Sequence, residues 1–289
     1  MSVFKLPIEV SRHDVYDFVS PHAGTQDAAK GKNVLITGGG TGIGEVMAKY
    51  FVMAGAAQIV LAGRRPQPLE QSKSQIDALG LPVKVLTIAT DVANPKSVAA
   101  LFSEAGRVDI LINNAGAYGQ NATFVKGNVD EWWTAFDVNV KGTYMVTQAW
   151  LRSLNGGPGV VLNLSSRSSY VAVAGLSSYE ISKSALNRLT ELVDKEHGKE
   201  GVVAIAFHPG GVAGTELSKH TPEWLQATFK DTPDLAGATS VYLSTPRAAF
   251  LSGRFVNAQW NMEQLEGLQD TIVADDLLKM RVLGIVDQV

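Results

Sequence analysis

The sequence contains no cysteine, which excludes disulfide bridges, thiolate nucleophiles and thiolate metal ligands. A zinc site would have to use histidine and carboxylate ligands alone, and the five histidines are scattered without the spacing of a ligand set. No metal centre is therefore expected, and the chemistry must come from hydroxyl, amino, amide and carboxylate groups.

Long apolar runs and a strong excess of one charge are also missing. No apolar run reaches the roughly 18 residues that a membrane span needs, and residues 1–18 lack the apolar core of a signal peptide. The formal net charge is only −3, and no basic cluster occurs along the chain. We therefore expect a cytoplasmic protein that binds neither nucleic acid nor membrane.

What the sequence does contain is a regular alternation of short apolar segments and helical patterns. This alternation is typical of βαβ units and predicts an α/β fold, a Rossmann-type doubly wound parallel sheet with helices on both faces. We expect one domain at 33–258, a lead-in at 1–32, and an extension at 259–289 packed on the same domain. The seven predicted strands are 33–37, 58–63, 83–89, 108–113, 160–164, 202–207 and 254–258.

A glycine-rich segment, Gly38 to Gly44 (GGGTGIG), lies between the first predicted strand and a helical pattern that begins at Ile43. Glycines permit a tight turn and let backbone N–H groups approach a pyrophosphate, which the amino terminus of the helix then stabilises. Strand, glycine loop and helix together form the context of a dinucleotide-binding site.

The second predicted strand ends in Arg64 and Arg65, about twenty residues after the glycine loop. An NAD site usually presents an acidic residue here to the ribose 2′-hydroxyl, whereas an arginine accommodates the 2′-phosphate of NADP. The alternative is a pair of solvated loop charges. The sequence thus favours NADP(H) as the cofactor.

A serine, a tyrosine and a lysine lie in fixed relation around the fifth predicted strand. Ser166 stands where that strand ends, and Tyr179 and Lys183 are spaced i, i+4 at the start of the next predicted helix. A tyrosine has a pKa of about 10, which a nearby ammonium lowers, and a serine hydroxyl could hold a substrate oxygen for proton transfer. A Tyr–Lys pair at this spacing is more often a surface lysine beside an aromatic ring than a catalytic pair. The surrounding motifs must therefore show which of the two it is.

That context is a series of motifs at the carboxyl ends of the predicted strands, where such sheets bind ligands. TGGGTGIG, the Asp91-Val92 pair, NNAG, DVNVKG, YEISK and HPGG, in this order, resemble the short-chain dehydrogenase/reductase family from about residue 33 to 258. The resemblance implies that Tyr179 is the general acid/base and that Lys183 lowers its pKa and holds the nicotinamide ribose. Ser166, thirteen residues before the tyrosine and preferred over Ser165, would position the reacting oxygen.

The resemblance also implies a fourth catalytic residue and a cofactor cleft. Asn139 would complete a water-linked proton relay, unless it only bonds backbone inside its helix. Asp91 would meet the adenine ring, while Asn114 is expected to be structural. Thr215 is not carried over, because the PGxVxT pattern is one residue longer here. The implied cofactor-binding residues are Gly38, Thr41, Gly42, Ile43, Gly44, Arg64, Arg65, Asp91, Val92, Asn113, Ala115, Gly116, Tyr179, Lys183, Pro209, Gly210 and Val212.

A lid is expected at about 212–232, after the sixth predicted strand. Its aromatic and apolar side chains suggest a fairly bulky, largely apolar substrate. The residues expected to surround that substrate are Tyr118, Tyr170, Trp224, Leu225, Phe229 and Trp260.

Two further segments have helical spacing. The pattern at 129–154 carries Trp132, Trp133 and Tyr144, which we expect in the core or at a subunit interface, and family resemblance implies a homodimer or homotetramer. The tail looks like the extended carboxyl ends of fungal short-chain reductases of specialised metabolism. Apolar residues at helical spacing in this tail are Leu277, Leu278, Met280 and Leu283.

The predicted function is an NADPH-dependent reductase, or in reverse a dehydrogenase, that transfers a hydride between NADP(H) and a ketone or secondary alcohol. One alternative is a non-redox step, such as a dehydration, epimerisation or cyclisation, performed with NADP(H) bound. Another is a non-catalytic NADP(H)-binding protein, which the intact set of four catalytic residues argues against. Stoichiometric oxidation of NADPH would separate a reductase from the non-redox enzyme.

Overall fold

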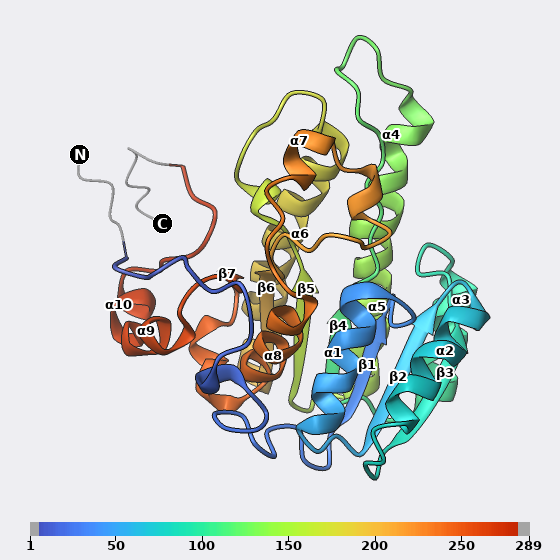
Figure 1. The fold of residues 1–289 in the computed structure, drawn as a ribbon, viewed down its shortest axis with the longest axis vertical. Helices are drawn as coiled ribbons and strands as arrows, with labels where there is room; N and C mark the ends of the chain where they lie inside the picture. The colour runs from blue at the N-terminus through green and yellow to red at the C-terminus, as the bar shows by residue number, and fades with distance from the viewer. Residues whose placement is uncertain (1–5, 283–289) are drawn as a thin grey trace.

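A parallel β-sheet forms the centre of the computed structural model, which describes residues 6–282 (Figure 1). The strand order is β3-β2-β1-β4-β5-β6-β7, and every neighbouring pair is parallel. The predicted seven-stranded Rossmann-type sheet is therefore confirmed, and each strand lies within two residues of its predicted bounds. The strands are β1 (Asn33–Thr37), β2 (Gln58–Gly63), β3 (Lys84–Ala89), β4 (Ile110–Asn113), β5 (Gly159–Leu164), β6 (Val202–His208) and β7 (Arg254–Asn257).

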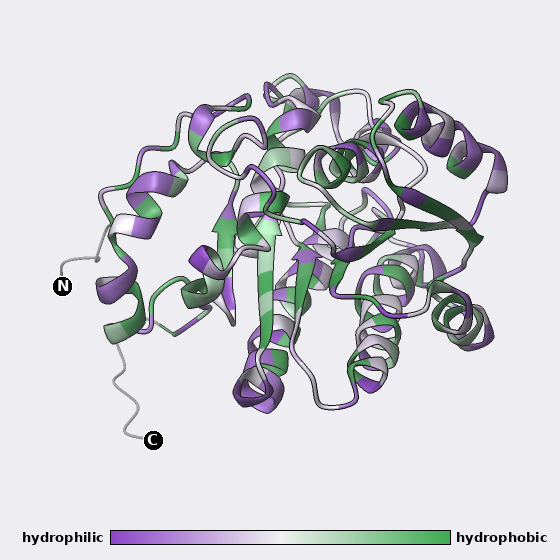
Figure 2. Ribbon diagram, turned by 90° about the horizontal axis from the view of Figure 1, so that it is seen from below, coloured by the Kyte–Doolittle hydropathy of each residue, from purple (hydrophilic) through white to green (hydrophobic). Residues whose placement is uncertain are grey.

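Helices cover both faces of the sheet and bury the strands on both sides. In β1, Val34 and Ile36 pack into one hydrophobic cluster and Leu35 into another. Burial on both faces explains why these strands are continuous apolar runs, as their colouring in Figure 2 shows. The helices are α1 (Gly42–Met53), α2 (Pro66–Asp77), α3 (Pro95–Ala105), α4 (Val129–Ala135), α5 (Thr143–Leu154), α6 (Ser177–His197), α7 (Glu223–Gln226), α8 (Pro233–Leu243), α9 (Met262–Gly267) and α10 (Gln269–Ala274).

Helix starts follow local sequence signals. Proline stands at the first turn of α2, α3 and α8, where its missing N–H and fixed φ do no harm. Asn94 caps α3 through bonds from two backbone N–H groups, and Thr232 caps α8. Short 3-10 turns occur at Asp17–Val19, Arg167–Ser169, Gly198–Glu200, Ser218–His220 and Pro246–Leu251.

The helical pattern predicted for 129–154 forms one continuous run with an interruption in its hydrogen bonding. Between α4 and α5 the segment Phe136–Gly142 is π-helical, so its N–H groups bond five residues back. Asn139 lies in this segment and is fully buried. The apolar periodicity of the sequence identified the helix but not the π turn. The π turn holds the Asn139 side chain inside the protein.

The lead-in and the carboxyl-terminal extension pack together beside β7 (Figure 1). Val10 and Trp260 form an isolated antiparallel bridge, and the Met262 N–H donates to the Tyr16 hydroxyl at 2.8 Å. Among residues 6–282, no helix is both long and apolar enough to cross a membrane.

The helical spacing predicted in the tail is wrong within the described residues. The last helix, α10, ends at Ala274, and Leu277, Leu278 and Met280 lie beyond it; Leu283 is outside the described residues. Leu278 has a positive φ of 64°, which a right-handed helix does not accommodate. Its carbonyl oxygen instead accepts a hydrogen bond from the N–H of Phe255 in β7 at 2.9 Å.

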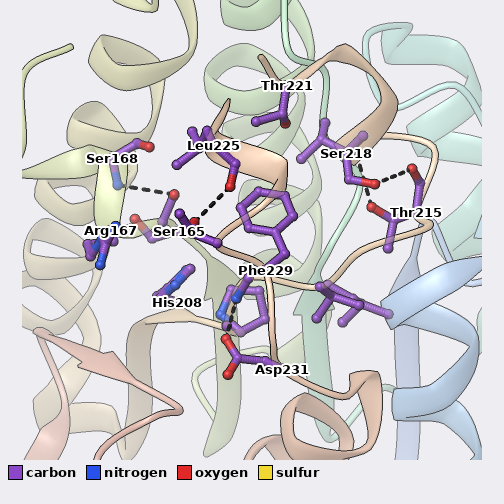
Figure 3. A pocket seen from close by; sticks show the side chains of 18 of the residues that line it. Ser165, Arg167, Ser168, His208, Thr215, Ser218, Thr221, Leu225, Phe229 and Asp231 are labelled. Atoms are coloured by element: carbon purple, nitrogen blue, oxygen red, sulfur yellow. Dashed lines mark hydrogen bonds between the residues drawn. The ribbon is translucent and has the colours of Figure 1, made fainter. Parts of the chain in front are cut away.

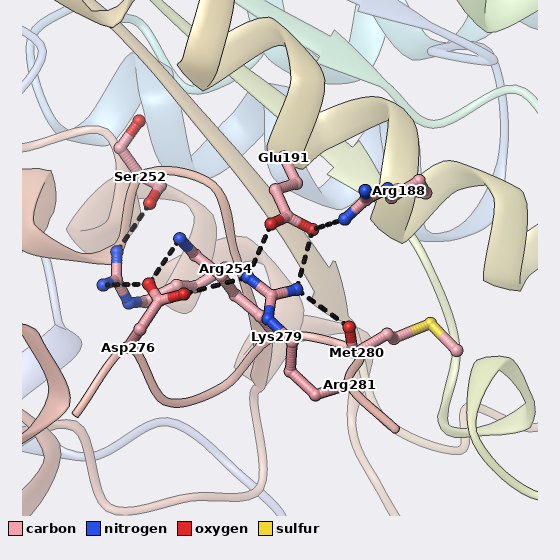
Figure 4. A network of polar contacts seen from close by, with 8 residues as sticks. All are labelled: Arg188, Glu191, Ser252, Arg254, Asp276, Lys279, Met280 and Arg281. Atoms are coloured by element: carbon pink, nitrogen blue, oxygen red, sulfur yellow. Dashed lines mark hydrogen bonds and ion pairs between the residues drawn. The ribbon is translucent and has the colours of Figure 1, made fainter. Parts of the chain in front are cut away.

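A polar network fixes this tail to the end of α6 (Figure 4). Arg281 donates to both oxygens of Glu191, at 2.6 and 3.1 Å, and to Asp276 at 2.9 Å. Arg254 in β7 also donates to Asp276, at 3.3 Å. Burial alone would raise the pKa of Glu191, but hydrogen bonds from Arg281 and Arg188 outweigh it and lower the pKa. The tail is thus tied to the helix that carries Tyr179 and Lys183.

Candidate active site

Three adjoining cavities lie along the carboxyl edge of the sheet. The arginine cavity is lined by residues that include Arg64, Arg65 and Asp91. The central cavity includes Gly42 and Lys183, and it shares Gly38, Thr41, Ala115 and Gly116 with the arginine cavity. The lid cavity includes Ser166, His208 and the lid, and it shares Ile43, Tyr179 and Pro209 with the central cavity. The shared residues make one elongated cleft.

The glycine loop forms one wall of this cleft and leaves no room for side chains at its turn. Gly38 and Gly42 have φ values of +67° and +58°, a region that favours glycine. A Cβ on Gly44 would lie 2.4 Å from the Gly38 oxygen and 2.5 Å from Nδ2 of Asn114. That amide donates to the carbonyls of Thr37 and Gly38, at 2.9 and 3.0 Å, so Asn114 holds the loop.

The arginine cavity receives side chains from the ends of β2 and β3. Arg64 and Arg65 follow β2 and are exposed, and Asp91 and Val92 follow β3. Asp91 accepts a hydrogen bond from the N–H of Ala93 at 3.0 Å. Glu216, from the lid, lines both this cavity and the central one. The cavity therefore presents guanidinium groups beside a carboxylate.

Asn113 does not face the cleft, contrary to what the family resemblance implied. Its side chain is buried in the protein, where Nδ2 donates to Thr147 at 3.0 Å and to Asn163 at 2.8 Å. Asn163 is its register partner in β5. Gly44 also lines none of the three cavities, because it packs beneath the loop. The other implied cofactor residues line at least one cavity.

The four proposed catalytic residues come together from three neighbouring elements. Tyr179 and Lys183 lie in the first turns of α6, and the Lys183 amine is 5.5 Å from the centre of the tyrosine ring. Lys183 Nζ donates to the carbonyl of Leu164, at the end of β5, at 2.6 Å. This bond joins the lysine of α6 to the end of β5, next to Ser165 and Ser166.

Asn139 lines none of the three cavities, and its side chain bonds to residues outside its own helix. Its Oδ1 accepts from the N–H of Ala117 at 2.8 Å, and its Nδ2 donates to the Ala117 carbonyl at 2.8 Å and to Ser182 at 2.9 Å. The amide thereby joins the segment after β4 to α6. Its side chain fixes the relative position of two walls of the cleft.

The two serines after β5 have different surroundings. Ser165 donates to the side-chain oxygen of Asn187 at 2.6 Å, which ties it to α6. Ser166 Oγ accepts from the N–H of Ser168 at 3.1 Å, and its hydroxyl faces that of Tyr179, whose pKa it lowers. The geometry supports the choice of Ser166 as the serine that contacts a ligand.

Burial dominates the ionisation of Tyr179 and Lys183. Burial raises the pKa of Tyr179, and the hydroxyl of Ser166 opposes this only in part. Burial also lowers the pKa of Lys183 to about 7. The expected lowering of the tyrosine pKa by the lysine is not found: burial is the largest influence on Tyr179, and the group that lowers its pKa is Ser166. Tyr179 is therefore a neutral phenol, which is a proton donor.

The lid contributes Thr215, Thr221, Leu225 and Phe229 to the cavity that Ser166 and Tyr179 also line (Figure 3). Asp231, at its end, accepts from the N–H of Gly211 at 2.5 Å and from Gln259 at 2.9 Å, and it pairs with His13 at 2.6 Å. The lid is thus anchored to the loop after β6, to the segment after β7 and to the lead-in. Thr215, left out of the sequence prediction, lines both the central and the lid cavities.

Only part of the predicted aromatic lining is correct. Tyr118, Leu225 and Phe229 line the lid cavity, whereas Tyr170, Trp224 and Trp260 do not. Trp224 is 59% exposed on the outside of the lid. The rings of Tyr170 and Trp260 instead pack edge to face against Phe255. The cavity has polar lining residues that sequence reasoning did not assign to the site, Arg167, His208 and Asp231.

Comparison with known proteins finds consistent similarities. A sequence model described as short chain dehydrogenase matches residues 32–226. A short chain dehydrogenase from Emericella variicolor is 35% identical over 97% of this chain and 97% of its own length. A structure from Agrobacterium tumefaciens with bound NADP is 26% identical, with a TM-score of 0.71 over 80% of this chain and 96% of that one.

A second solved structure carries the other nicotinamide cofactor. It is a 7α-hydroxysteroid dehydrogenase in complex with NADH and 7-oxo glycochenodeoxycholic acid, and it is 26% identical with a TM-score of 0.72. The match covers 79% of this chain and 94% of that one. Structural similarity therefore extends to proteins that bind either NADP or NADH, so the choice between them depends on this chain's own residues.

Proposed function

Because the chain belongs to the short-chain dehydrogenase/reductase family of oxidoreductases, we propose that it is an NADP(H)-dependent reductase of ketones, or in reverse a dehydrogenase of secondary alcohols. One observation carries the proposal: Tyr179 lies at the junction of the central and lid cavities, with Ser166 and Lys183 beside it. We place the reaction in specialised metabolism, on the resemblance of the extended carboxyl end to those of fungal reductases.

The residues of the cleft fit a dinucleotide. The turn at Gly38 and Gly42 and the amino terminus of α1 would hold the pyrophosphate, since no Cβ blocks the backbone there. Asp91 and Val92 would border the adenine ring, and Arg64 and Arg65 the ribose phosphate. Pro209, Thr215 and Lys183 in the central cavity would border the nicotinamide ribose. Bound NADPH would supply the hydride that reduces the carbonyl carbon.

Side chains of the protein would bind and protonate the carbonyl oxygen of the substrate. Ser166, whose hydroxyl lies beside that of Tyr179, would hold the carbonyl oxygen. Tyr179 would give its phenolic proton to that oxygen, so that ketone, hydride and proton combine to the alcohol. The raised pKa of Tyr179 keeps the phenol protonated, as a proton donor must be. Asn139 would keep the cleft walls in place through Ala117 and Ser182.

Arg64→Ala should weaken NADPH binding by about tenfold to a hundredfold and leave NADH binding nearly unchanged. The physical reason is that a charge-assisted hydrogen bond from a guanidinium to the 2′-phosphate contributes about 1.5–3 kcal/mol. Titration of both cofactors against both proteins, followed by fluorescence, measures the effect. Equal losses for NADPH and NADH would show that Arg64 does not recognise the phosphate. Arg152→Ala, at an exposed position of α5, serves as the matched control.

We also propose that the protein is a homodimer or homotetramer. Trp133 on α4 and Tyr144 on α5 are 51% and 53% exposed, and aromatic side chains of this kind are enriched at subunit interfaces. Light scattering at micromolar concentration should give a mass of two or four chains. A single-chain mass would contradict this proposal and leave the catalytic one untouched.

The reductase proposal is tested by incubating the protein with NADPH and a panel of bulky ketones. The expected result is oxidation of one NADPH for each alcohol formed. Conversion of a compound without NADPH consumption would favour a dehydration, epimerisation or cyclisation instead. Cofactor binding with no conversion of any compound would favour a binding protein.

A further inference from the structure

Two buried polar atoms of the lid cavity have no hydrogen-bond partner within the described chain. Among residues 6–282, the buried side-chain atoms without a partner include the Tyr118 hydroxyl and His208 Nδ1, and both residues line this one cavity. Buried polar groups are almost always satisfied, by protein, ordered water or a ligand. A partner for these groups is therefore expected from what occupies the cavity.

Tyr118 lies directly beside the proposed proton donor. It follows β4, is 6% exposed, and stacks on the ring of Tyr179 with the ring centres 4.9 Å apart and the planes at 18°. Burial raises the pKa of Tyr118 to about 12, so its hydroxyl is neutral and can both donate and accept. Thr221 of the lid also lines this cavity close to the Tyr118 hydroxyl and opposes the rise in its pKa, but no hydrogen bond of good geometry joins the two side chains.

His208, the second of the two residues, comes from β6. It is the last residue of β6, and its carbonyl oxygen accepts from the N–H of Ala258 at 2.9 Å, which fixes its backbone. Burial lowers the pKa of His208 to about 4, so the imidazole is neutral at pH 7, with one donor and one acceptor nitrogen. Figure 3 shows its ring among Ser165, Arg167 and Asp231.

The strand order gives these two residues a fixed relation to the reacting centre. β5, which leads into Ser166, lies between β4 and β6 in the sheet. Tyr118 follows β4 and His208 ends β6, so the two residues approach the cavity from strands on opposite sides of β5. The lid contributes apolar side chains to the same cavity, Leu217, Leu225 and Phe229.

We propose that the substrate is a polyoxygenated ketone, with hydroxyl or oxo groups on both sides of the reacting carbonyl, one bound by Tyr118 and the other by His208. This inference rests on the proposed reductase function and refines it. The carbon skeleton would contact the apolar residues of the lid. A ketone with no second oxygen would leave both buried groups unpaired, and sites built to bind a substrate hydroxyl strongly reject analogues that lack it.

The test compares 1-tetralone with its hydroxylated and oxo derivatives in the wild-type protein and in Tyr118→Phe, with NADPH as cofactor. Wild-type kcat/KM should be about tenfold to a hundredfold higher for the best oxygenated ketone than for 1-tetralone. Tyr118→Phe keeps the stacked ring and removes the hydroxyl. It should remove most of that preference, mainly through KM, because the oxygenated derivatives lose a hydrogen bond that 1-tetralone does not make. Tyr170→Phe, which removes a hydroxyl from a half-exposed ring outside the lid cavity, should behave as wild type.

His208 is tested with two variants. His208→Phe should lower kcat/KM for derivatives oxygenated on the second side by about fivefold to a hundredfold, whereas His208→Asn, which retains a donor and an acceptor, should restore part of the loss. Equal losses for 1-tetralone and its derivatives in both Tyr118→Phe and His208→Phe would overturn the inference, because they would mean that these residues only position Tyr179. The reductase proposal would survive that result.

Binding separates the two proposals if no ketone is turned over. That outcome would refute the reductase function. Calorimetric titration of the NADP⁺ complex with the same compounds would then decide the inference. Tighter binding of oxygenated derivatives, lost in Tyr118→Phe, would support recognition of a polyoxygenated molecule. Equal binding of all compounds, or no binding of any, would refute it.

Discussion

Tyr179→Phe is expected to lower kcat by about 10²- to 10⁴-fold while NADPH still binds, because general acid–base catalysis typically contributes that much. The tyrosine is 8% exposed, and the phenylalanine ring would keep its stacking on Tyr118. The substitution thus removes the proton donor and little else. Steady-state turnover of a ketone substrate measures the loss, and cofactor fluorescence confirms that NADPH is bound.

Ser166→Ala provides the comparison for this variant. Its loss should be smaller than that of Tyr179→Phe, because water can replace a positioning hydrogen bond more easily than a proton donor. If Tyr179→Phe turned over the natural substrate at the wild-type rate with NADPH bound, redox chemistry through these residues would be the wrong account. A non-redox reaction would then take its place.

Lys183→Met is expected to lose both turnover and cofactor affinity. Lys183 lines the central cavity, is 4% exposed, and is held by its bond to the Leu164 carbonyl at 2.6 Å. As an ammonium it would serve the tyrosine and the nicotinamide ribose together. We expect kcat/KM to fall by at least about 10²-fold and the Kd for NADPH to rise by about tenfold or more.

The matched control is Lys195→Met, at an exposed position near the end of the same helix. It should leave both turnover and the Kd for NADPH near the wild-type values. Thermal unfolding of both variants shows whether either change perturbs the fold. A Lys183→Met protein that loses turnover but binds NADPH normally would contradict a role at the ribose and restrict the lysine to the tyrosine.

Most strands could be predicted because they are apolar runs buried on both faces, a pattern that needs no knowledge of the rest of the chain; the edge strand β3 is only partly buried. Which side chains at a strand end reach the cleft could not. Successive residues of a strand point to opposite faces, so Asn113 is directed toward Asn163 in β5 while Asn114 reaches the glycine loop. The NNAG motif located this edge of the sheet and Asn114 has the structural role expected of it, but Asn113 is turned into the protein.

The tail and the aromatic lining were mispredicted for a related reason. Apolar spacing at Leu277 and Leu278 resembles a helix, but the backbone there is used by the edge of β7. Tyr170 and Trp260 are aromatic and near the lid in sequence or fold, yet they pack against Phe255. Both outcomes depend on long-range contacts, which local spacing does not contain.

The π-helical segment at 136–142 also limits how the length of this chain can vary in evolution. A π turn holds one more residue than the α turn that it replaces, so loss of one residue there would leave an uninterrupted α-helix. Each residue of an α-helix advances by about 100°, so α5 would rotate by that angle relative to α4. Either Trp150 would leave the core or Asn139 would leave Ala117. Substitutions should therefore be tolerated along this helix far more readily than a single-residue deletion within the π turn.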